Sequence, residues 1–264
     1  MCDLWRQAAE GPLPVGAVPR QLAAALKTAR AQGPLPPVIK LYNSGSFFDR
    51  RSVPPEDYPA LVRLLAPFQR VVVECHPRLV GERVAAFQRM LHEEEGGTLE
   101  VAMGLETAHP EVLARLNKGM TREDFLRATD FLRKHNLEAR AFVLLQPPFM
   151  PPAESVEWAV KSAAFAFAAG VSVVAMIPVR AGNGALEALA REGLFVEPTL
   201  TQLEMAVAEA RPLKRGRLLA DLWDLERFRR CPRCFAARRR RLERFNHTQR
   251  LGPPVACPQC GGGA

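Results

Sequence analysis

The stretch Leu99–Thr121, LEVAMGLETAHPEVLARLNKGMT, decides the fold of this chain. Its first half is an apolar strand that runs into Gly104–Thr107, and an amphipathic helix follows before a turn at Asn117–Gly119. A carboxylate directly after a buried strand is typical of an α/β barrel, because the carboxyl ends of the strands open onto the active-site face. Glu106 is therefore the first candidate site residue.

The same alternation of strand and helix continues on both sides of this stretch. The expected strands are Val38–Tyr42, Arg70–Cys75, Leu99–Met103, Ala139–Leu145, Ser172–Ile177 and, further on, Arg215–Leu222. The expected helices are Pro19–Arg30, Pro59–Leu65, Gly81–Glu94, Glu111–Leu116, Arg122–His135, Glu154–Ala169 and Leu200–Ala210. Apolar strands separated by helices predict a parallel sheet covered by helices, in a partial or complete (β/α) barrel. A doubly wound open sheet is the alternative, although no GxGxxG follows any strand.

Composition limits the class of protein. With 264 residues, 48% of them hydrophobic, the chain is long enough for one large core and a small appendage. No run of about eighteen apolar residues suggests a membrane span, and residues 1–16 lack the pattern of a secretory signal. We therefore expect a cytoplasmic protein without membrane contact. Four of its six cysteines lie in CxxC pairs, which favours metal binding over disulfides.

Positive charge is concentrated at the carboxyl end. The formal net charge is +8, and residues 211–264 carry 14 Lys/Arg against 4 Asp/Glu. The first 210 residues are slightly acidic, so the composition predicts a body at 1–226 and a basic tail at 227–264. Such an asymmetry indicates an anionic partner, with nucleic acid as the first candidate. A merely solvated tail is the alternative.

The tail contains the firmest chemical signal, a pair of cysteine knuckles. Cys231-Pro-Arg-Cys234 and Cys257-Pro-Gln-Cys260 are separated by 22 residues. Two such pairs present four thiolates to one Zn²⁺ in a zinc-ribbon-like arrangement. An iron–sulfur cluster on the same thiolates, or free or disulfide-bonded thiols, remain alternatives.

An arginine-rich segment, residues 235–250, lies between the two knuckles. Guanidinium groups neutralise phosphates, and Phe235, Phe245 and His247 offer surfaces on which bases stack. This combination favours RNA or single-stranded nucleic acid over a protein partner. A simple surface role is the alternative for His247.

Four motifs in the body resemble a known family. They are KLYNSGSFFD at Lys40–Asp49, VVVECHP at Val71–Pro77, VAMGLET with LNKGMT in the opening stretch, and IPVRAGNGALEALA at Ile177–Ala190. Together they resemble the radical S-adenosylmethionine (SAM) superfamily, in the branch shared by methylthiotransferases and elongator-type tRNA enzymes, nearest to the radical SAM partner of archaeosine synthase and its bacterial relatives. The resemblance extends from Cys2 to about Arg250.

The resemblance implies an α/β fold: a partial (β/α)6 barrel that lacks its first strand, followed by the small zinc-ribbon-like tail. It also implies SAM and a [4Fe–4S] cluster held by a CxxxCxxC loop. Cys2, in Met1-Cys2-Asp3-Leu4-Trp5, resembles the third cysteine of that loop. We therefore expect that Met1 is an internal methionine and that the first strand and two cysteines precede it. A genuine loss of the loop is the alternative, and Cys75 is expected to be a buried core thiol.

The family's SAM-binding positions carry over onto specific residues of this chain. The resemblance implies that the SAM amino group is bound by the turn Asn43, Ser44, Gly45 and Ser46. It implies that Glu74 and Glu106, at two strand ends, face the ribose or the methionyl end of SAM, and that Ile177, at a later strand end, lies beside the adenine. For the two glutamates the alternative is an ion pair at the barrel rim, for example with Arg140 or Arg180.

The function that this resemblance implies is reductive cleavage of SAM at the cluster, which starts a radical modification of a tRNA nucleoside. Glu106 would then be the catalytic-site carboxylate, and an electron-donor protein would be a partner. Two other hypotheses stay open. In the first, the chain as written is a non-catalytic nucleic-acid-binding protein with a zinc ribbon. In the second, it is a barrel enzyme that does not use SAM, with Glu74 and Glu106 as an acid–base pair. The sequence does not specify the substrate or the oligomeric state.

Overall fold

The computed structural model describes residues 11–43, 45–94, 96–182 and 184–260. These residues form two compact units. The N-terminal unit contains the described residues of 11–104 together with 123–140, and the C-terminal unit contains 105–122 together with 141–260. The boundary passes through two strands, so the chain enters the C-terminal unit at Leu105, returns at Glu123 and leaves again at Ala141.

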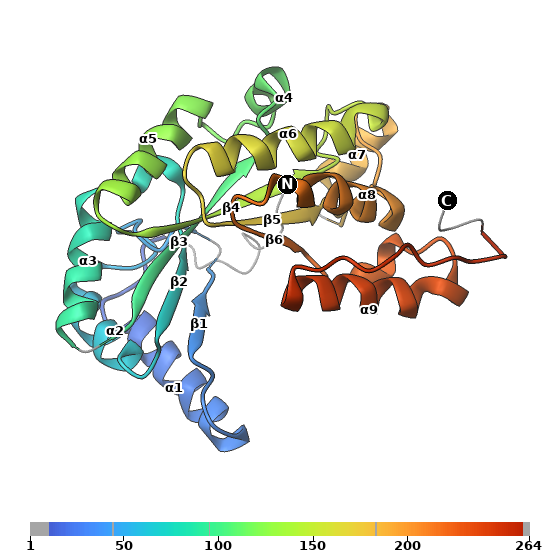
Figure 1. Ribbon diagram of the computed structural model, residues 1–264. Helices are drawn as coiled ribbons and strands as arrows, with labels where there is room; N and C mark the ends of the chain where they lie inside the picture. The colour runs from blue at the N-terminus through green and yellow to red at the C-terminus, as the bar shows by residue number, and fades with distance from the viewer. Residues whose placement is uncertain (1–10, 44, 95, 183, 261–264) are drawn as a thin grey trace. The chain divides into compact units, whose positions relative to one another are not determined.

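The elements alternate between helix and strand as the hydrophobic pattern predicts (Figure 1). The strands are β1 (Val38–Leu41), β2 (Arg70–Glu74), β3 (Thr98–Glu106), β4 (Glu138–Leu145), β5 (Val173–Pro178) and β6 (Arg217–Ala220). The helices are α1 (Ala17–Gln32), α2 (Tyr58–Leu65), α3 (Glu82–Glu93), α4 (Pro110–Arg115), α5 (Arg122–Lys134), α6 (Ser155–Ala168), α7 (Ala185–Arg191), α8 (Leu200–Ala210) and α9 (Pro232–Thr248). Short 3₁₀ turns lie at Pro55–Asp57, Pro77–Leu79, Pro152–Glu154, Arg211–Leu213 and Leu225–Phe228. None of the helices in these described ranges combines the length and apolar character needed to cross a membrane.

The six strands form one sheet in chain order, β1-β2-β3-β4-β5-β6. The pairs β1–β2, β2–β3 and β5–β6 are parallel, with Val38 opposite Arg70, Val71 opposite Leu99 and Val173 opposite Arg217. A sheet in which every strand neighbours the next one along the chain, with helices between them, is the arrangement of an α/β barrel. The fold class predicted from the sequence, an α/β partial barrel, is confirmed. The further strand expected within Arg215–Leu222 is also present, as β6.

The N-terminal unit is stabilised by an aromatic cluster and by a charged network. Phe47, Phe48, Tyr58 and Phe87 pack with ring centroids 5.1–6.2 Å apart. On the sheet, the carboxylate of Glu100 is fully buried and binds the guanidinium groups of Arg70 and Arg140; Arg70 also binds Glu138, at 2.8 Å. The buried Glu100 charge is therefore compensated by two arginines, as buried charges require.

The C-terminal unit extends its sheet edge with side chains of α9. The carboxamide of Asn246 bonds both the backbone N–H and the carbonyl of Ala220, at 2.9 and 2.8 Å. One helical turn later, Gln249 does the same to Leu218, at 2.8 and 2.9 Å. Two amide side chains thus satisfy the outer edge of β6 as a seventh strand would, which protects an edge that could otherwise pair with another chain. The helix α9 is consequently fixed to the sheet.

Candidate metal centre and strand-end residues

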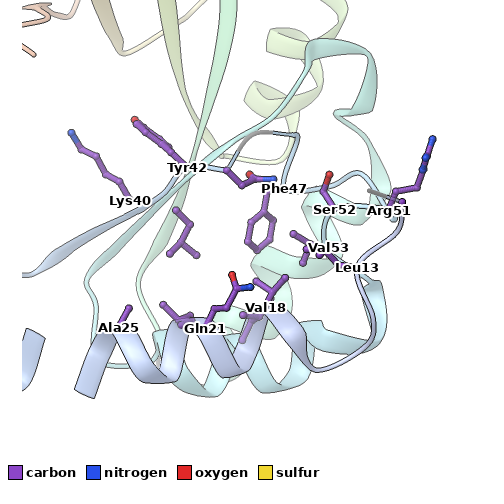
Figure 2. A pocket seen from close by; sticks show the side chains of 15 residues that line it. Leu13, Val18, Gln21, Ala25, Lys40, Tyr42, Phe47, Arg51, Ser52 and Val53 are labelled. Carbon is purple, nitrogen blue, oxygen red and sulfur yellow. The ribbon is translucent and has the colours of Figure 1, made fainter. Parts of the chain in front are cut away.

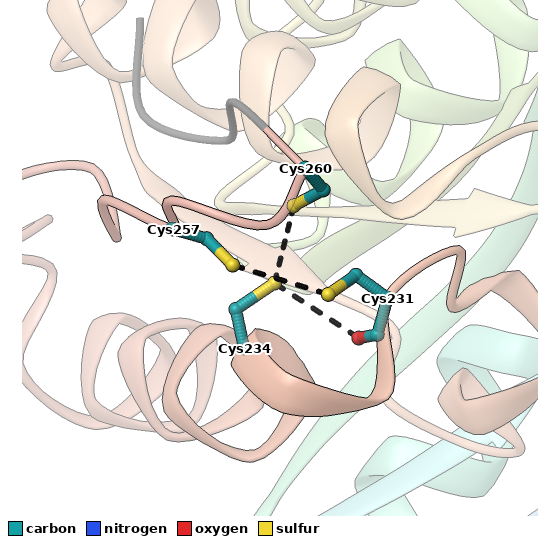
Figure 3. Close-up of side chains that lie close together, drawn as sticks. All are labelled: Cys231, Cys234, Cys257 and Cys260. Carbon is teal, nitrogen blue, oxygen red and sulfur yellow. Dashed lines mark hydrogen bonds between the residues drawn. The ribbon is translucent and has the colours of Figure 1, made fainter.

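Four cysteines of the C-terminal unit converge on one point (Figure 3). The Sγ atoms of Cys231, Cys234, Cys257 and Cys260 all lie within 4.8 Å of one another. The two cross-knuckle pairs are closest, with 3.9 Å between Cys231 and Cys257 and 3.8 Å between Cys234 and Cys260. Three of the four side chains are buried, and Cys260 is exposed. The predicted grouping of the two knuckles is confirmed, and these residues could hold a metal ion.

The spacing of the sulfurs suits a single ion. A Zn–S bond of about 2.3 Å places the four corners of a tetrahedron about 3.8 Å apart, which matches the two cross-knuckle distances of 3.8 and 3.9 Å. In a cubane iron–sulfur cluster each thiolate binds a different iron, so the four sulfurs must lie farther apart than around one ion. The compact group therefore fits Zn²⁺ better than a cluster.

Local backbone structure prepares each knuckle for a metal. Cys231 is the N-cap of α9, and Pro232 occupies the first helical position, where its missing N–H costs nothing. The partial positive charge of a helix N-terminus favours thiolates in this first turn. In the second knuckle, the backbone N–H groups of Gln259 and Cys260 lower the pKa of Cys257 to about 7. In the first knuckle, by contrast, burial and the neighbouring thiols raise the pKa of Cys234 to about 12, so without a metal the thiolate is favoured at Cys257 and the thiol at Cys234.

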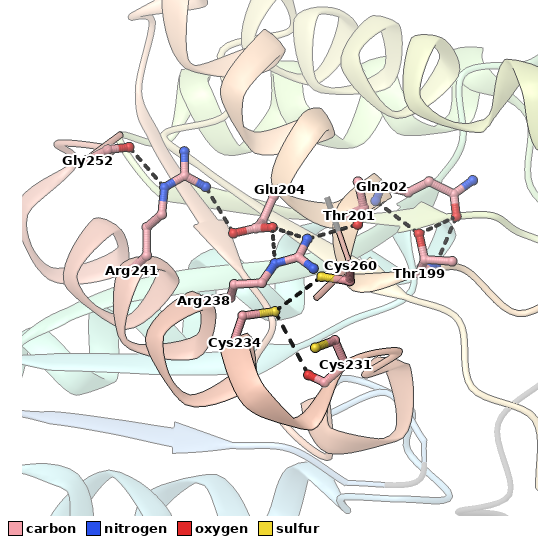
Figure 4. A network of polar contacts seen from close by, with 10 residues as sticks. All are labelled: Thr199, Thr201, Gln202, Glu204, Cys231, Cys234, Arg238, Arg241, Gly252 and Cys260. Carbon is pink, nitrogen blue, oxygen red and sulfur yellow. Dashed lines mark hydrogen bonds and ion pairs between the residues drawn. The ribbon is translucent and has the colours of Figure 1, made fainter. Parts of the chain in front are cut away.

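A buried ionic network links the metal centre to α8 (Figure 4). Glu204 on α8 accepts from Arg238 Nε at 2.6 Å and from Arg241 Nη1 at 3.0 Å. Arg238 also donates to Thr201 Oγ1 at 2.8 Å, and Arg241 donates to the carbonyl of Gly252 at 2.9 Å. Because Gly252 belongs to the segment that leads to the second knuckle, one glutamate organises both sides of the metal centre.

These contacts revise the predicted nucleic-acid interface. Arg238 and Arg241 have side chains only 10% exposed and bind Glu204, so they are structural rather than free for phosphate. The expectation that Phe245 stacks on bases is wrong, because its ring is 1% exposed and belongs to the core. His247 is exposed and Phe235 is half-buried. The exposed arginines of the described tail are Arg227, Arg229, Arg230, Arg233, Arg239, Arg240, Arg244 and Arg250.

Glu204 and the helix α9 are features that our reading of the sequence missed. A signal for the helix existed: the buried residues of α9 are Cys234, Arg238, Leu242 and Phe245, whose spacing of four, four and three is that of one helical face. No comparable signal exists for Glu204, since it lies 34 residues from Arg238.

The turn after β1 contains the residues that the sequence analysis predicts to bind the amino group of SAM. Ser46 Oγ accepts from the backbone N–H of His76 at 2.8 Å, which ties the turn to the end of β2. Gly45 lies close to Ser52 there: a Cβ atom would be 2.4 Å from Ser52 Oγ, so a larger residue would require the Ser52 side chain to move. Asn43 Oδ1 is buried and has no hydrogen-bond partner among the described residues. Ser44 lies outside the described residues.

A cavity of about 510 Å³ adjoins this turn (Figure 2). It lies between α1 and β1, and Leu13, Val18, Phe47 and Val53 form much of its apolar wall. Asn43 also lines it. The cavity is thus largely apolar, with Asn43 as one of its polar lining residues.

The two predicted strand-end carboxylates lie in different units. Glu74 ends β2 in the N-terminal unit, where its backbone carbonyl accepts from Phe47 N at 2.8 Å. Glu106 ends β3 in the C-terminal unit with φ +64°, a left-handed conformation that side-chain-bearing residues seldom adopt. Its carboxylate is 13% exposed and forms an ion pair with Lys118. Strained residues of this kind are concentrated at functional sites.

The remaining predicted positions are also located. Ile177 lies near the end of β5 and is half-buried. The alternative for Glu106, an ion pair at the strand ends, is observed, with Lys118 rather than Arg140 or Arg180 as the partner. Arg180 instead binds Asp221 at 2.8 Å, and Arg140 binds Glu100.

The described residues do not fit a [4Fe–4S] cluster in the body. Apart from the four tail cysteines, the described ranges contain Cys75 alone, and a cubane cluster of this kind needs several thiolates. Cys75 is 1% exposed and donates to the carbonyl of His76 at 3.3 Å, which confirms its expected role as a core thiol. Cys2 lies outside the described residues.

We expect Cys75 to resist alkylation in the folded protein. Burial raises the pKa of its thiol to about 12, so the thiolate fraction at pH 8 falls to about 1 in 10⁴. Iodoacetamide at pH 8, followed by peptide mass spectrometry, should label Cys75 only after denaturation. Fast labelling of Cys75 in the native protein would contradict the burial.

Part of the chain is similar in sequence to three archaeal proteins. The chain is 31% identical over 140 residues to archaeosine synthase subunit beta of Thermococcus kodakarensis, which covers 52% of this chain and 42% of that protein. It is 30% identical over 129 residues to the same subunit of Methanosarcina acetivorans, covering 47% of this chain and 37% of that one. An uncharacterized protein of Methanocaldococcus jannaschii is 26% identical over 153 residues, covering 56% and 41%. The chain thus spans about two fifths of the length of these curated relatives.

Among solved structures, archaeal Elp3 of Methanocaldococcus infernus with an N-terminal deletion has a similar fold. The TM-score is 0.56 at 14% identity, and the match covers 76% of this chain and 51% of that one. No family model matches the chain. Over about half of its length the chain is therefore a sequence relative of archaeosine synthase subunit beta, and its fold is similar to that of archaeal Elp3.

Proposed function

We propose that the protein takes part in the radical modification of a tRNA nucleoside. When bound, a [4Fe–4S] cluster would supply the electron that cleaves SAM, and an electron-donor protein would reduce it. Cys2 is the one residue of this chain that we assign to that cluster. The observation that supports the proposal best is the relationship to archaeosine synthase subunit beta over 140 residues.

The strand ends of the body would hold SAM. The amide oxygen of Asn43 is buried and has no hydrogen-bond partner within the described ranges, and an oxygen of this kind suits the ammonium group of an amino acid. Glu74 and Glu106 end β2 and β3, and a carboxylate accepts from a ribose diol or an ammonium. Gly45 and Ser46 would shape the turn, and Ile177 would provide apolar contact to the adenine.

The tail would bind the RNA. We assign Zn²⁺ to the four cysteines, because their sulfur spacing is that of a tetrahedral zinc–thiolate site. The metal would hold the second knuckle against α9, whose exposed arginines include Arg239, Arg240 and Arg244. Such side chains neutralise phosphates and give a salt-dependent affinity for RNA.

The test is SAM cleavage by protein made from its own genomic locus and purified without oxygen. With dithionite and SAM we expect 5′-deoxyadenosine, together with iron in addition to zinc. A Cys257→Ser variant serves as a matched control, since it should lose zinc but retain SAM cleavage. Absence of both iron and 5′-deoxyadenosine would contradict the enzymatic proposal.

A second candidate function, a zinc-containing nucleic-acid-binding protein without radical chemistry, is favoured by one observation. The described body holds a single cysteine, Cys75, and it is buried. In that case the same preparation would contain zinc but no iron and would bind tRNA. If iron-free protein instead showed SAM-independent activity, the hypothesis of an acid–base pair of Glu74 and Glu106 would gain support.

A further inference from the structure

Trp223 is the most exposed large hydrophobic side chain of the described residues, at 72%. It follows β6 at the carboxyl end of the strand. Open parallel α/β sheets bind their ligands at this end of the strands. An indole ring left in water at such a position calls for an explanation, because large aromatic side chains are usually buried in the absence of a partner.

The ring is the outer member of a stack. The guanidinium carbon of Arg180 lies 5.0 Å from the centroid of Trp223 and 5.4 Å from the centroid of Phe228. Phe228 is buried at 4% exposure, and the Arg180 side chain is 11% exposed. Arg180 therefore lies between the buried Phe228 ring and the Trp223 ring, and much of the indole faces solvent.

The loop that carries Trp223 is fixed by hydrogen bonds. Asp221 N donates to the carbonyl of Met176 at 2.8 Å, and Trp223 N donates to Asp221 Oδ1 at 3.2 Å. Arg180 binds Asp221 Oδ2 at 2.8 Å and also donates to the carbonyl of Trp223. A side chain presented by a preorganised loop loses little entropy on binding a ligand.

We propose that Trp223 is a stacking platform for a nucleobase of the RNA substrate. The proposal rests on the proposed RNA-related function. Every base has a π-face, and stacking on an aromatic ring is the usual way in which proteins bind unpaired bases. The cation of Arg180 on the inner face and the exposed arginines that follow, such as Arg230 and Arg233, give the surroundings the charge that an RNA backbone requires. Trp223 would hold the base, and the arginines would hold phosphates.

The test compares Trp223→Ala and Trp223→Phe in the full chain, with fluorescein-labelled 12-mers of RNA that contain bases or abasic sites. We expect Trp223→Ala to weaken binding of the base-containing RNA by about 5- to 100-fold and to leave the abasic RNA unaffected. Trp223→Phe should keep most of the affinity. The dependence on salt should not change, whereas Arg240→Ala should weaken both RNAs and reduce that dependence. Thermal unfolding of Trp223→Ala should match the wild type, since the side chain is exposed.

Two results would overturn the inference in different ways. If the wild type binds RNA and Trp223→Ala binds both oligonucleotides equally well, Trp223 is not a base platform, and the proposed function stands. A loss of binding to a protein partner without any change in RNA affinity would assign the ring to a protein interface and would likewise overturn it. If the wild type binds neither RNA nor tRNA, the proposed function fails together with the inference.

Discussion

Replacing Cys231 by serine is expected to remove the metal and release the second knuckle. Zinc in four-ligand peptide sites binds with about 10–16 kcal/mol, so the loss of one thiolate should weaken binding by about 10²- to 10³-fold. The helix α9 should stay docked, because Leu242 and Phe245 are buried and Asn246 still caps β6. The segment that follows α9 should then become accessible to proteases.

Limited proteolysis with trypsin measures this directly. Arg250 is exposed and lies between α9 and the second knuckle, so we expect rapid cleavage there in Cys231→Ser and in chelator-treated wild type. Cys75→Ala is the matched control, since it removes a buried cysteine far from the four-thiol group in sequence and should retain the metal. If chelated protein resisted trypsin at Arg250, the metal would not organise the tail.

Glu204→Ala is expected to destabilise the C-terminal unit by about 3–5 kcal/mol, because it leaves uncompensated buried charge. Arg238 and Arg241 both bind this carboxylate, and their side chains are 10% exposed. A urea titration followed by circular dichroism should show the midpoint shifted to lower urea. We also expect faster loss of zinc to a chelator, because Arg241 binds Gly252 next to the second knuckle.

Glu243→Ala provides the control for this prediction. Glu243 also pairs with an arginine of α9, Arg239, at 2.8 Å, but both side chains are solvent-accessible, at 39% and 54%. Exposed pairs of this kind contribute less than about 1 kcal/mol. If the two substitutions lowered the free energy of unfolding equally, Glu204 would not be compensating the buried charges of Arg238 and Arg241.

The strands of the body were predictable because their residues are apolar almost throughout. β2 ends one residue earlier than expected, and β5 begins and ends one residue later. β3 continues three residues beyond the expected end at Met103, to Glu106. That extension includes the left-handed Glu106, a backbone conformation that no local sequence pattern specified.

The tail was predictable in its chemistry but not in its structure. Two CxxC pairs identify a metal site from spacing alone, and the four sulfurs do converge. The run Arg238–Arg241, in contrast, suggested a uniformly solvated and RNA-facing segment. Two of its arginines are turned inward by Glu204, and Asn246 and Gln249 serve the edge of β6. Those roles depend on partners about 30 residues away, which composition and periodicity do not identify.

Mass spectrometry of the intact, anaerobically purified protein under non-denaturing conditions tests the central claim most directly, because one spectrum reports both metals. The claim is that a radical SAM-type body carries a zinc-organised, RNA-binding tail. For protein made from its own genomic locus we predict one zinc per chain, a [4Fe–4S] cluster on the same molecule, and loss of the zinc alone in Cys231→Ser. Iron lost together with the tail thiolates, or a chain that carries no zinc, would contradict the account.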